Sequence, residues 1–73
     1  MIELGRYRHY KGTEYQVIGV GLHTATLKEM VIYYNPANSD QFWVRPLTMF
    51  IESVTVNGQK KPRFMYIQKE GDV

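Results

Sequence analysis

The stretch from residue 14 to residue 22 constrains the fold of this chain more than any other. Its apolar side chains alternate at positions 15 and 17, and then continue one residue out of phase at 18, 20 and 22. A slip of this kind inside an alternating strand indicates a β-bulge or a bend, and Gly19 and Gly21 make bending easier there. The sequence therefore predicts a bent strand, which is a feature that small closed sheets need in order to curl.

The rest of the chain consists of short apolar runs separated by turn residues. Further strands are predicted at 6–11, 27–34, 42–45, 51–56 and 64–67, with a loop at 35–40. Pro46 suits the start of one helical turn that ends at Phe50. Asn57-Gly58 favours a type I′ hairpin turn, and Pro62 places the returning strand at an edge. The prediction is an all-β fold, a small SH3-like antiparallel barrel of five to six short strands with one short helical or 3₁₀ turn. An OB-fold is the second alternative.

Length and composition limit how this fold is stabilised. A chain of 73 residues has room for a single domain over residues 1–73, with a core at about 5–67 and a flexible tail at 68–73. Because there is no cysteine, disulfides and cysteine-ligated zinc are excluded. The ten aromatic residues are expected to dominate the packing. The other predicted core residues are Leu27, Met30, Val31, Met49 and Phe50.

Location and assembly are expectations from bulk properties. No apolar run approaches the ~18 residues of a membrane helix. The first residues carry no apolar run of the kind found in a secretory signal. A cytoplasmic protein that does not bind membranes is expected, as a monomer or a weak homodimer.

Three stretches together resemble a known family. They are "GRYRHYKG" at 5–12 with the Tyr-x-Val that follows, His23 ahead of "MVIY" at 30–33, and "WVRPLTMF" at 43–50. In combination they resemble the small bacterial domain-of-unknown-function 1653 family, over roughly residues 5–67. This resemblance implies a compact β domain and implies no established biochemical activity.

Motifs for catalysis and for metal binding are not found in the sequence. There is no nucleophile elbow, phosphate-binding loop or paired-carboxylate motif. His9 and His23 are the two histidines, and a small metalloprotein or enzyme would require them to converge. The chain is expected not to be an enzyme and to use no cofactor or metal.

Aromatic and arginine side chains are the leading candidates for binding. Trp43 and Arg45 share one face of a strand, where an indole and a guanidinium can bind a ligand by stacking, by cation–π contact and by bidentate hydrogen bonds to a carboxylate or phosphate. The alternative is that Trp43 fills one end of the core and Arg45 pairs with a glutamate. With Tyr10 added, these side chains predict a protein- or peptide-binding module.

Single-stranded nucleic acid is the alternative ligand. The net charge of +2 makes no basic stripe by itself, but two clusters of basic residues occur. Aromatic rings beside them would stack on bases. The alternative is that these charges are solvated strand ends, and the discriminating observation is whether the clusters meet on one face. The clusters consist of Arg6, Arg8, His9 and Lys11, and of Lys60, Lys61 and Arg63.

Overall fold

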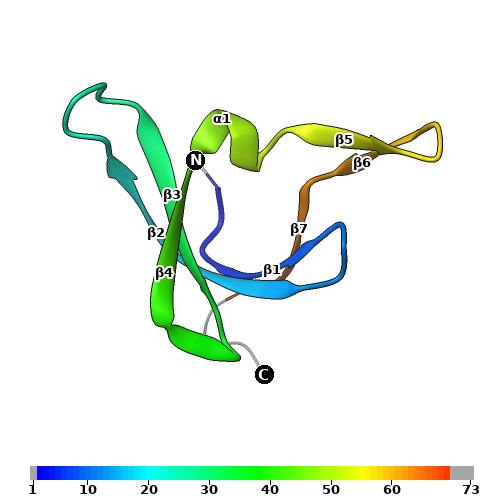
Figure 1. Cartoon of the computed structure of the whole chain (residues 1–73), viewed down its shortest axis with the longest axis horizontal. Helices are drawn as coiled ribbons and strands as arrows, with labels where there is room; N and C mark the ends of the chain where they lie inside the picture. The colour runs from blue at the N-terminus through cyan, green and yellow to red at the C-terminus, as the bar shows by residue number, and fades with distance from the viewer. Residues whose placement is uncertain (1, 70–73) are drawn as a thin grey trace.

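The computed structural model describes residues 2–69, which form seven strands and one short helix (Figure 1). The elements are β1 (Gly5–His9), β2 (Glu14–Leu22), β3 (Glu29–Asn35), β4 (Asn38–Pro46), α1 (Leu47–Phe50), β5 (Ser53–Val56), β6 (Gln59–Pro62) and β7 (Phe64–Lys69). Five strands form an antiparallel sheet in the order β4-β3-β2-β1-β7, and β5 and β6 form a separate hairpin. The all-β prediction is confirmed, with more strands than the five or six expected.

The five-stranded sheet does not close into a barrel. Within residues 2–69, β4 and β7 lie at its two edges and do not pair with each other. The β5–β6 hairpin extends away from the sheet, on the right of Figure 1, instead of bridging those edges. The predicted barrel is therefore corrected to an open, curled sheet.

The predicted bulge lies where the apolar pattern changes phase. The pairing of β2 with β3 shifts register between Val17 and Gly19. Val17 then stands opposite Tyr33, and Val20 stands opposite Val31. Without the extra residue these two valines, three positions apart, would point to opposite faces of the sheet. The bulge thus turns both toward the core.

The core is mainly aromatic. The short helix α1 carries Phe50 into it, and its ring stacks on Phe64 with the centroids 4.1 Å apart. Tyr7 and Tyr33 meet the Phe50 ring edge-on. Two predicted core residues are instead exposed: Leu27 lies in the loop between β2 and β3, and Met49 lies in α1, where Phe50 is the buried residue. The buried residues are Tyr7, Val17, Val31, Tyr33, Phe50 and Phe64.

Two predicted boundaries change for local reasons. The predicted loop at 35–40 is a tight turn, because Asn35 Oδ1 accepts a hydrogen bond from the Ala37 backbone N–H at 2.8 Å. This lets β4 begin at Asn38 and run for nine residues. The first strand ends at His9 instead of Lys11, because Gly12, at φ +107°, closes a turn there.

The predicted hairpin turn is confirmed, since both Asn57 and Gly58 have positive φ angles of 52° and 80°. Strand β7 runs from Phe64 to Lys69, so it extends two residues past the predicted core end at 67, and residues 70–73 of the predicted tail lie outside the described residues. Among the described residues no helix is long and apolar enough to cross a membrane.

Candidate functional site

A cleft of about 360 Å³ opens between the β1–β2 turn and β6. Three of the residues that line this cleft are cations, and no lining residue is acidic. The volume is at the lower end of the roughly 300–1,000 Å³ of ligand pockets, so it suits one unit of a polymer. We call it the cationic cleft, and its lining residues are Arg8, His9, Tyr10, Gly12, Lys60, Lys61, Pro62 and Met65.

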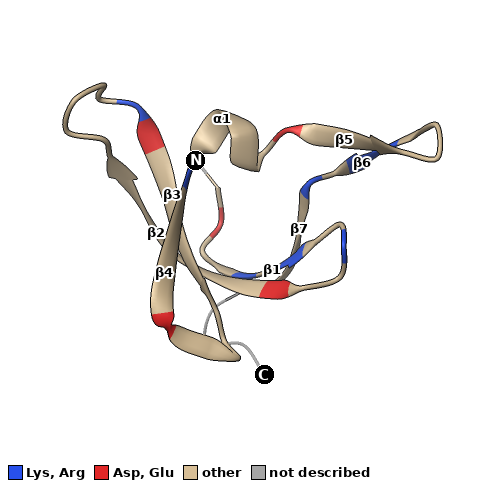
Figure 2. Cartoon of the chain, viewed as in Figure 1, with Lys and Arg blue, Asp and Glu red and all other residues tan. Residues whose placement is uncertain are grey.

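The cationic cleft joins the two basic clusters that lie far apart in the sequence. Figure 2 shows the lysines and arginines of β1, the β1–β2 turn and β6 gathered on the right side of the molecule. Within the described part of the chain, Lys11, Lys60 and Lys61 form no ion pair. Their charges are available to an anionic ligand.

Arg6 and Arg8 share one carboxylate on the outer face of β1. Arg8 donates a hydrogen bond to Glu14 at 2.9 Å, and Arg6 approaches the same carboxylate at 3.5 Å. The hydrogen bond from Arg8 is the main reason that the pKa of Glu14 is lowered. Arg8 lines the cationic cleft and Arg6 does not. The two arginines therefore contribute less free charge than the sequence implies.

His9 and Tyr10 provide aromatic surface in the cationic cleft. Their ring centroids are 4.5 Å apart, and the Lys11 ammonium lies 5.8 Å from the Tyr10 centroid. His9 Nδ1 accepts a hydrogen bond from the Lys11 backbone N–H at 3.2 Å. Burial lowers the pKa of His9, and the cations of Arg45, Arg63 and Lys11 lower it further. A neutral imidazole with Nδ1 occupied keeps its proton on Nε2, as a donor.

Arg63 is mostly covered and does not line the cationic cleft. Its side chain is 20% exposed, and its guanidinium donates a hydrogen bond to Glu52 at 3.1 Å. Its Nε is buried and has no hydrogen-bond partner. The backbone of Arg63 accepts a hydrogen bond from the Tyr10 N–H. Arg63 thus fixes the β1–β2 turn against β7.

Trp43 and Arg45 share the core-side face of β4, as their spacing predicts, but their surroundings differ. Trp43 stands opposite Tyr33 and is exposed. Arg45 Nε donates a hydrogen bond to the Tyr33 hydroxyl at 3.3 Å, and its guanidinium lies 5.6 Å from the Phe64 ring centroid. Trp43 therefore does not fill the core, and Arg45 covers it instead of pairing with a glutamate. Among the described residues the rings of Tyr10 and Trp43 are not in contact, since the Tyr10 ring lies against His9 and Lys11.

The two histidines are held in separate places. His23 Nδ1 accepts hydrogen bonds from the backbone N–H groups of Ala25 and Thr26, at 3.1 and 3.3 Å, and so organises the β2–β3 loop. Over residues 2–69 there is no group of three or more His, Asp and Glu side chains that could hold a metal ion.

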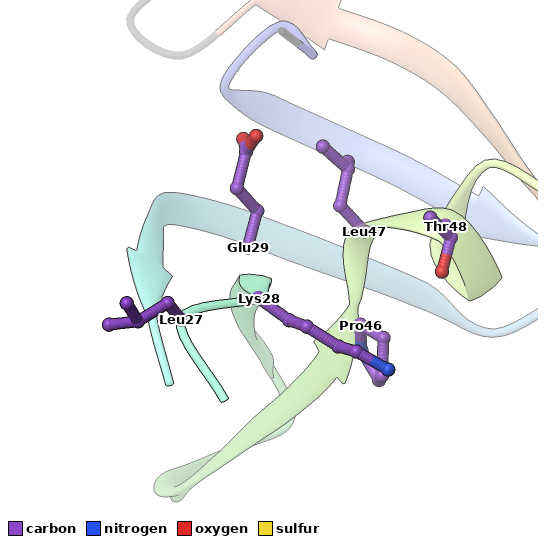
Figure 3. Close-up of a pocket in the computed structure, with 6 residues that line it drawn as sticks. All are labelled: Leu27, Lys28, Glu29, Pro46, Leu47 and Thr48. Atoms are coloured by element: carbon purple, nitrogen blue, oxygen red, sulfur yellow. The ribbon is translucent and has the colours of Figure 1, made fainter. Parts of the chain in front are cut away.

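A second cleft of about 360 Å³ lies between the β2–β3 loop and the start of α1 (Figure 3). Leu27, Pro46 and Leu47 give it apolar walls, while Lys28 and Glu29 extend in different directions. Leu27 is exposed and has a φ of +60°, a conformation that is costly for leucine. The second cleft is lined by one cation, Lys28, and one carboxylate, Glu29, so its charges balance and it does not favour an anionic ligand. Nothing in the sequence pattern pointed to this cleft or to Pro62 and Met65 in the other one.

The fold and the cationic cleft define a small open β-sheet domain that presents cations and aromatic rings together. The chain belongs to the family described as protein of unknown function (DUF1653), whose model matches residues 5–66. The resemblance read from the sequence is therefore confirmed. A crystal structure of a DUF1653 protein from Bordetella bronchiseptica is similar, with a TM-score of 0.81 and 29% identity. The match covers 99% of this chain and 95% of that one. None of the curated proteins matches the chain.

Proposed function

We propose that this domain is a non-catalytic module that binds single-stranded nucleic acid in the cationic cleft. The observation that carries the proposal is the meeting of Arg8 with Lys60 and Lys61 around one cleft that has no acidic lining residue. Such cations bind phosphates, and exposed aromatic rings beside them stack on bases. Tyr10 and His9 provide rings in that position.

The peptide-binding alternative has less support. It relies on Tyr10, Trp43 and Arg45 acting on one ligand. The Arg45 guanidinium is already engaged by the Tyr33 hydroxyl and the Phe64 ring, so a peptide carboxylate would have to displace them. We also retain the SH3-like arrangement as a proposal, which the curled sheet and the short helix α1 after β4 support.

Salt dependence gives the first test. If Lys11, Lys60 and Lys61, which form no ion pair among the described residues, each neutralise one phosphate, the logarithm of the affinity falls with the logarithm of the salt concentration with a slope of about −2. Affinity then drops roughly 20-fold between about 50 and about 200 mM salt. Fluorescence anisotropy with a labelled mixed-sequence single-stranded oligonucleotide measures this. If polyglutamate binds as tightly as the oligonucleotide, the ligand of the cleft would be an acidic peptide instead of nucleic acid.

Two charge reversals form a matched pair. Lys61→Glu and Lys28→Glu change the net charge equally, but Lys28 lines the other cleft. We expect Lys61→Glu to weaken binding at least about tenfold and to reduce the salt slope by roughly 0.7. Lys28→Glu should change the binding affinity by less than about twofold. Equal effects of the two variants, or no binding at low salt, would refute the proposal.

Tyr10→Ala separates stacking from charge. Stacking on one aromatic ring contributes about 1–3 kcal/mol per base. We expect Tyr10→Ala to weaken binding by at least about fivefold while leaving the salt slope unchanged. If Tyr10→Ala keeps full affinity, Tyr10 does not stack on the ligand, and the cleft binds phosphates through its cations alone.

A further inference from the structure

Strand β4 forms a free edge of the five-stranded sheet, on the opposite side of the molecule from the cationic cleft (Figure 1). It is nine residues long, and its side chains from Asn38 to Val44 are all exposed. An edge strand presents unpaired backbone N–H and C=O groups along one side. Long and apolar edges pair readily with another strand unless the sequence blocks them.

The centre of β4 carries none of the residues that block pairing. Phe42, Trp43 and Val44 are consecutive, and no Lys or Pro interrupts the strand before Pro46. The hairpin strand β6 differs, because Lys60, Lys61 and Pro62 make up most of it. Lysine and proline side chains of this kind protect an edge strand from pairing. Strand β7 forms the other edge of the five-stranded sheet, but it has six residues against the nine of β4. β4 is thus the longer open edge of that sheet.

We propose that β4 pairs with β4 of a second copy of this chain, antiparallel and centred on Trp43. When two copies of a strand pair antiparallel about one shared residue, the residues that stand opposite each other point to the same side. The core-side faces of the two sheets therefore lie on one side, and the outer faces lie on the other. In this register Trp43 stands opposite Trp43 of the second copy, and Phe42 stands opposite Val44. Centring the pair on Phe42 would instead set Val44 against Asp40. The Trp43 register therefore matches apolar side chains with apolar ones.

Charge favours a second copy as the occupant. β4 contains one acidic residue, Asp40, and one basic residue, Arg45, so the strand carries no net charge. In the Trp43 register Arg45 stands opposite the neutral Gln41, and Asp40 stands opposite Pro46. Lys60 and Lys61, which form no ion pair among the described residues, lie at the cationic cleft and not at β4. Two copies of a chain with a net charge of +2 can therefore meet at β4 with little repulsion.

The exposed area predicts a weak dimer. Phe42, Trp43 and Val44 are 61%, 47% and 62% exposed. With ~200 Å² for a large aromatic side chain, both copies together bury about 500 Å² of apolar surface. Stable interfaces bury about 1,200–2,000 Å² in total, so the dimer is expected to form only at about 10 µM to 1 mM.

Trp43 reports on this pairing directly, because it is the single tryptophan of the chain. We expect sedimentation equilibrium of the whole chain to give a monomer–dimer equilibrium. The Trp43 emission should shift to shorter wavelength over the same concentrations, as the indole leaves water. A chain that stays monomeric up to about 1 mM with constant emission would overturn the proposal and leave the edge to a different partner.

Two matched variants locate the interface. Val44→Lys and Ile51→Lys introduce the same charge at side chains that are 62% and 60% exposed, and Ile51 lies outside the strands. We expect Val44→Lys to weaken dimerisation by at least about tenfold and Ile51→Lys to leave it within about twofold. A dimer that survives Val44→Lys would place the interface elsewhere. Neither residue lines the cationic cleft, so this result is independent of nucleic-acid binding.

Discussion

Phe50→Ala tests whether the aromatic cluster holds this domain together. Phe50 is 1% exposed, stacks on Phe64, and contacts Tyr7 and Tyr33 edge-on with centroids 5.2 and 5.7 Å away. Truncating a buried phenylalanine costs about 3–5 kcal/mol. Folding stabilities of about 0.05–0.15 kcal/mol per residue give roughly 4–11 kcal/mol for this chain. We therefore expect Phe50→Ala to remove about 4 kcal/mol, a large share of the free energy of unfolding.

Urea denaturation followed by circular dichroism measures this loss by linear extrapolation. Met49→Ala is the matched control, since Met49 precedes Phe50 in α1 but is exposed, and it should cost less than about 1 kcal/mol. If Phe50→Ala does not fold, Phe50→Leu keeps the comparison measurable, with an expected loss of about 1–2 kcal/mol. Equal losses for Met49→Ala and the Phe50 variants would refute the argument that Phe50 anchors the core.

Two further predictions concern His9 and the glycines. Because burial and nearby cations lower the pKa of His9 in the folded chain, the unfolded chain takes up this proton at higher pH. Stability should therefore fall as pH decreases from about 7 to about 5, and His9→Gln should flatten that slope in urea titrations. Gly58→Ala should cost about 1 kcal/mol, because φ is +80° there, whereas Gly19→Ala should stabilise by about 0.5 kcal/mol. Neither Cβ would meet an atom within 4 Å, so thermal unfolding that ranks them the other way would contradict the backbone argument.

Local patterns in the sequence identified the elements that depend on neighbouring residues. The phase slip in 14–22 located the bulge between Val17 and Gly19, and Asn57-Gly58 located the hairpin turn. Both features follow from backbone geometry within a few residues, so no knowledge of distant contacts is needed. The combination of motifs across the chain also identified the family.

Pairing between distant strands decided which side chains are accessible. Trp43 is exposed because β4 lies at the edge of the sheet, and no pattern within β4 specifies that position. Lys60 and Lys61 meet Arg8 because the chain after the β5–β6 hairpin returns to pair β7 with β1. The sequence by itself determined the all-β class, the bulge, the Asn57-Gly58 turn and the family. Only the tertiary structure decided which residues form the core, the cationic cleft and the open edge, because each depends on strand order in the sheet.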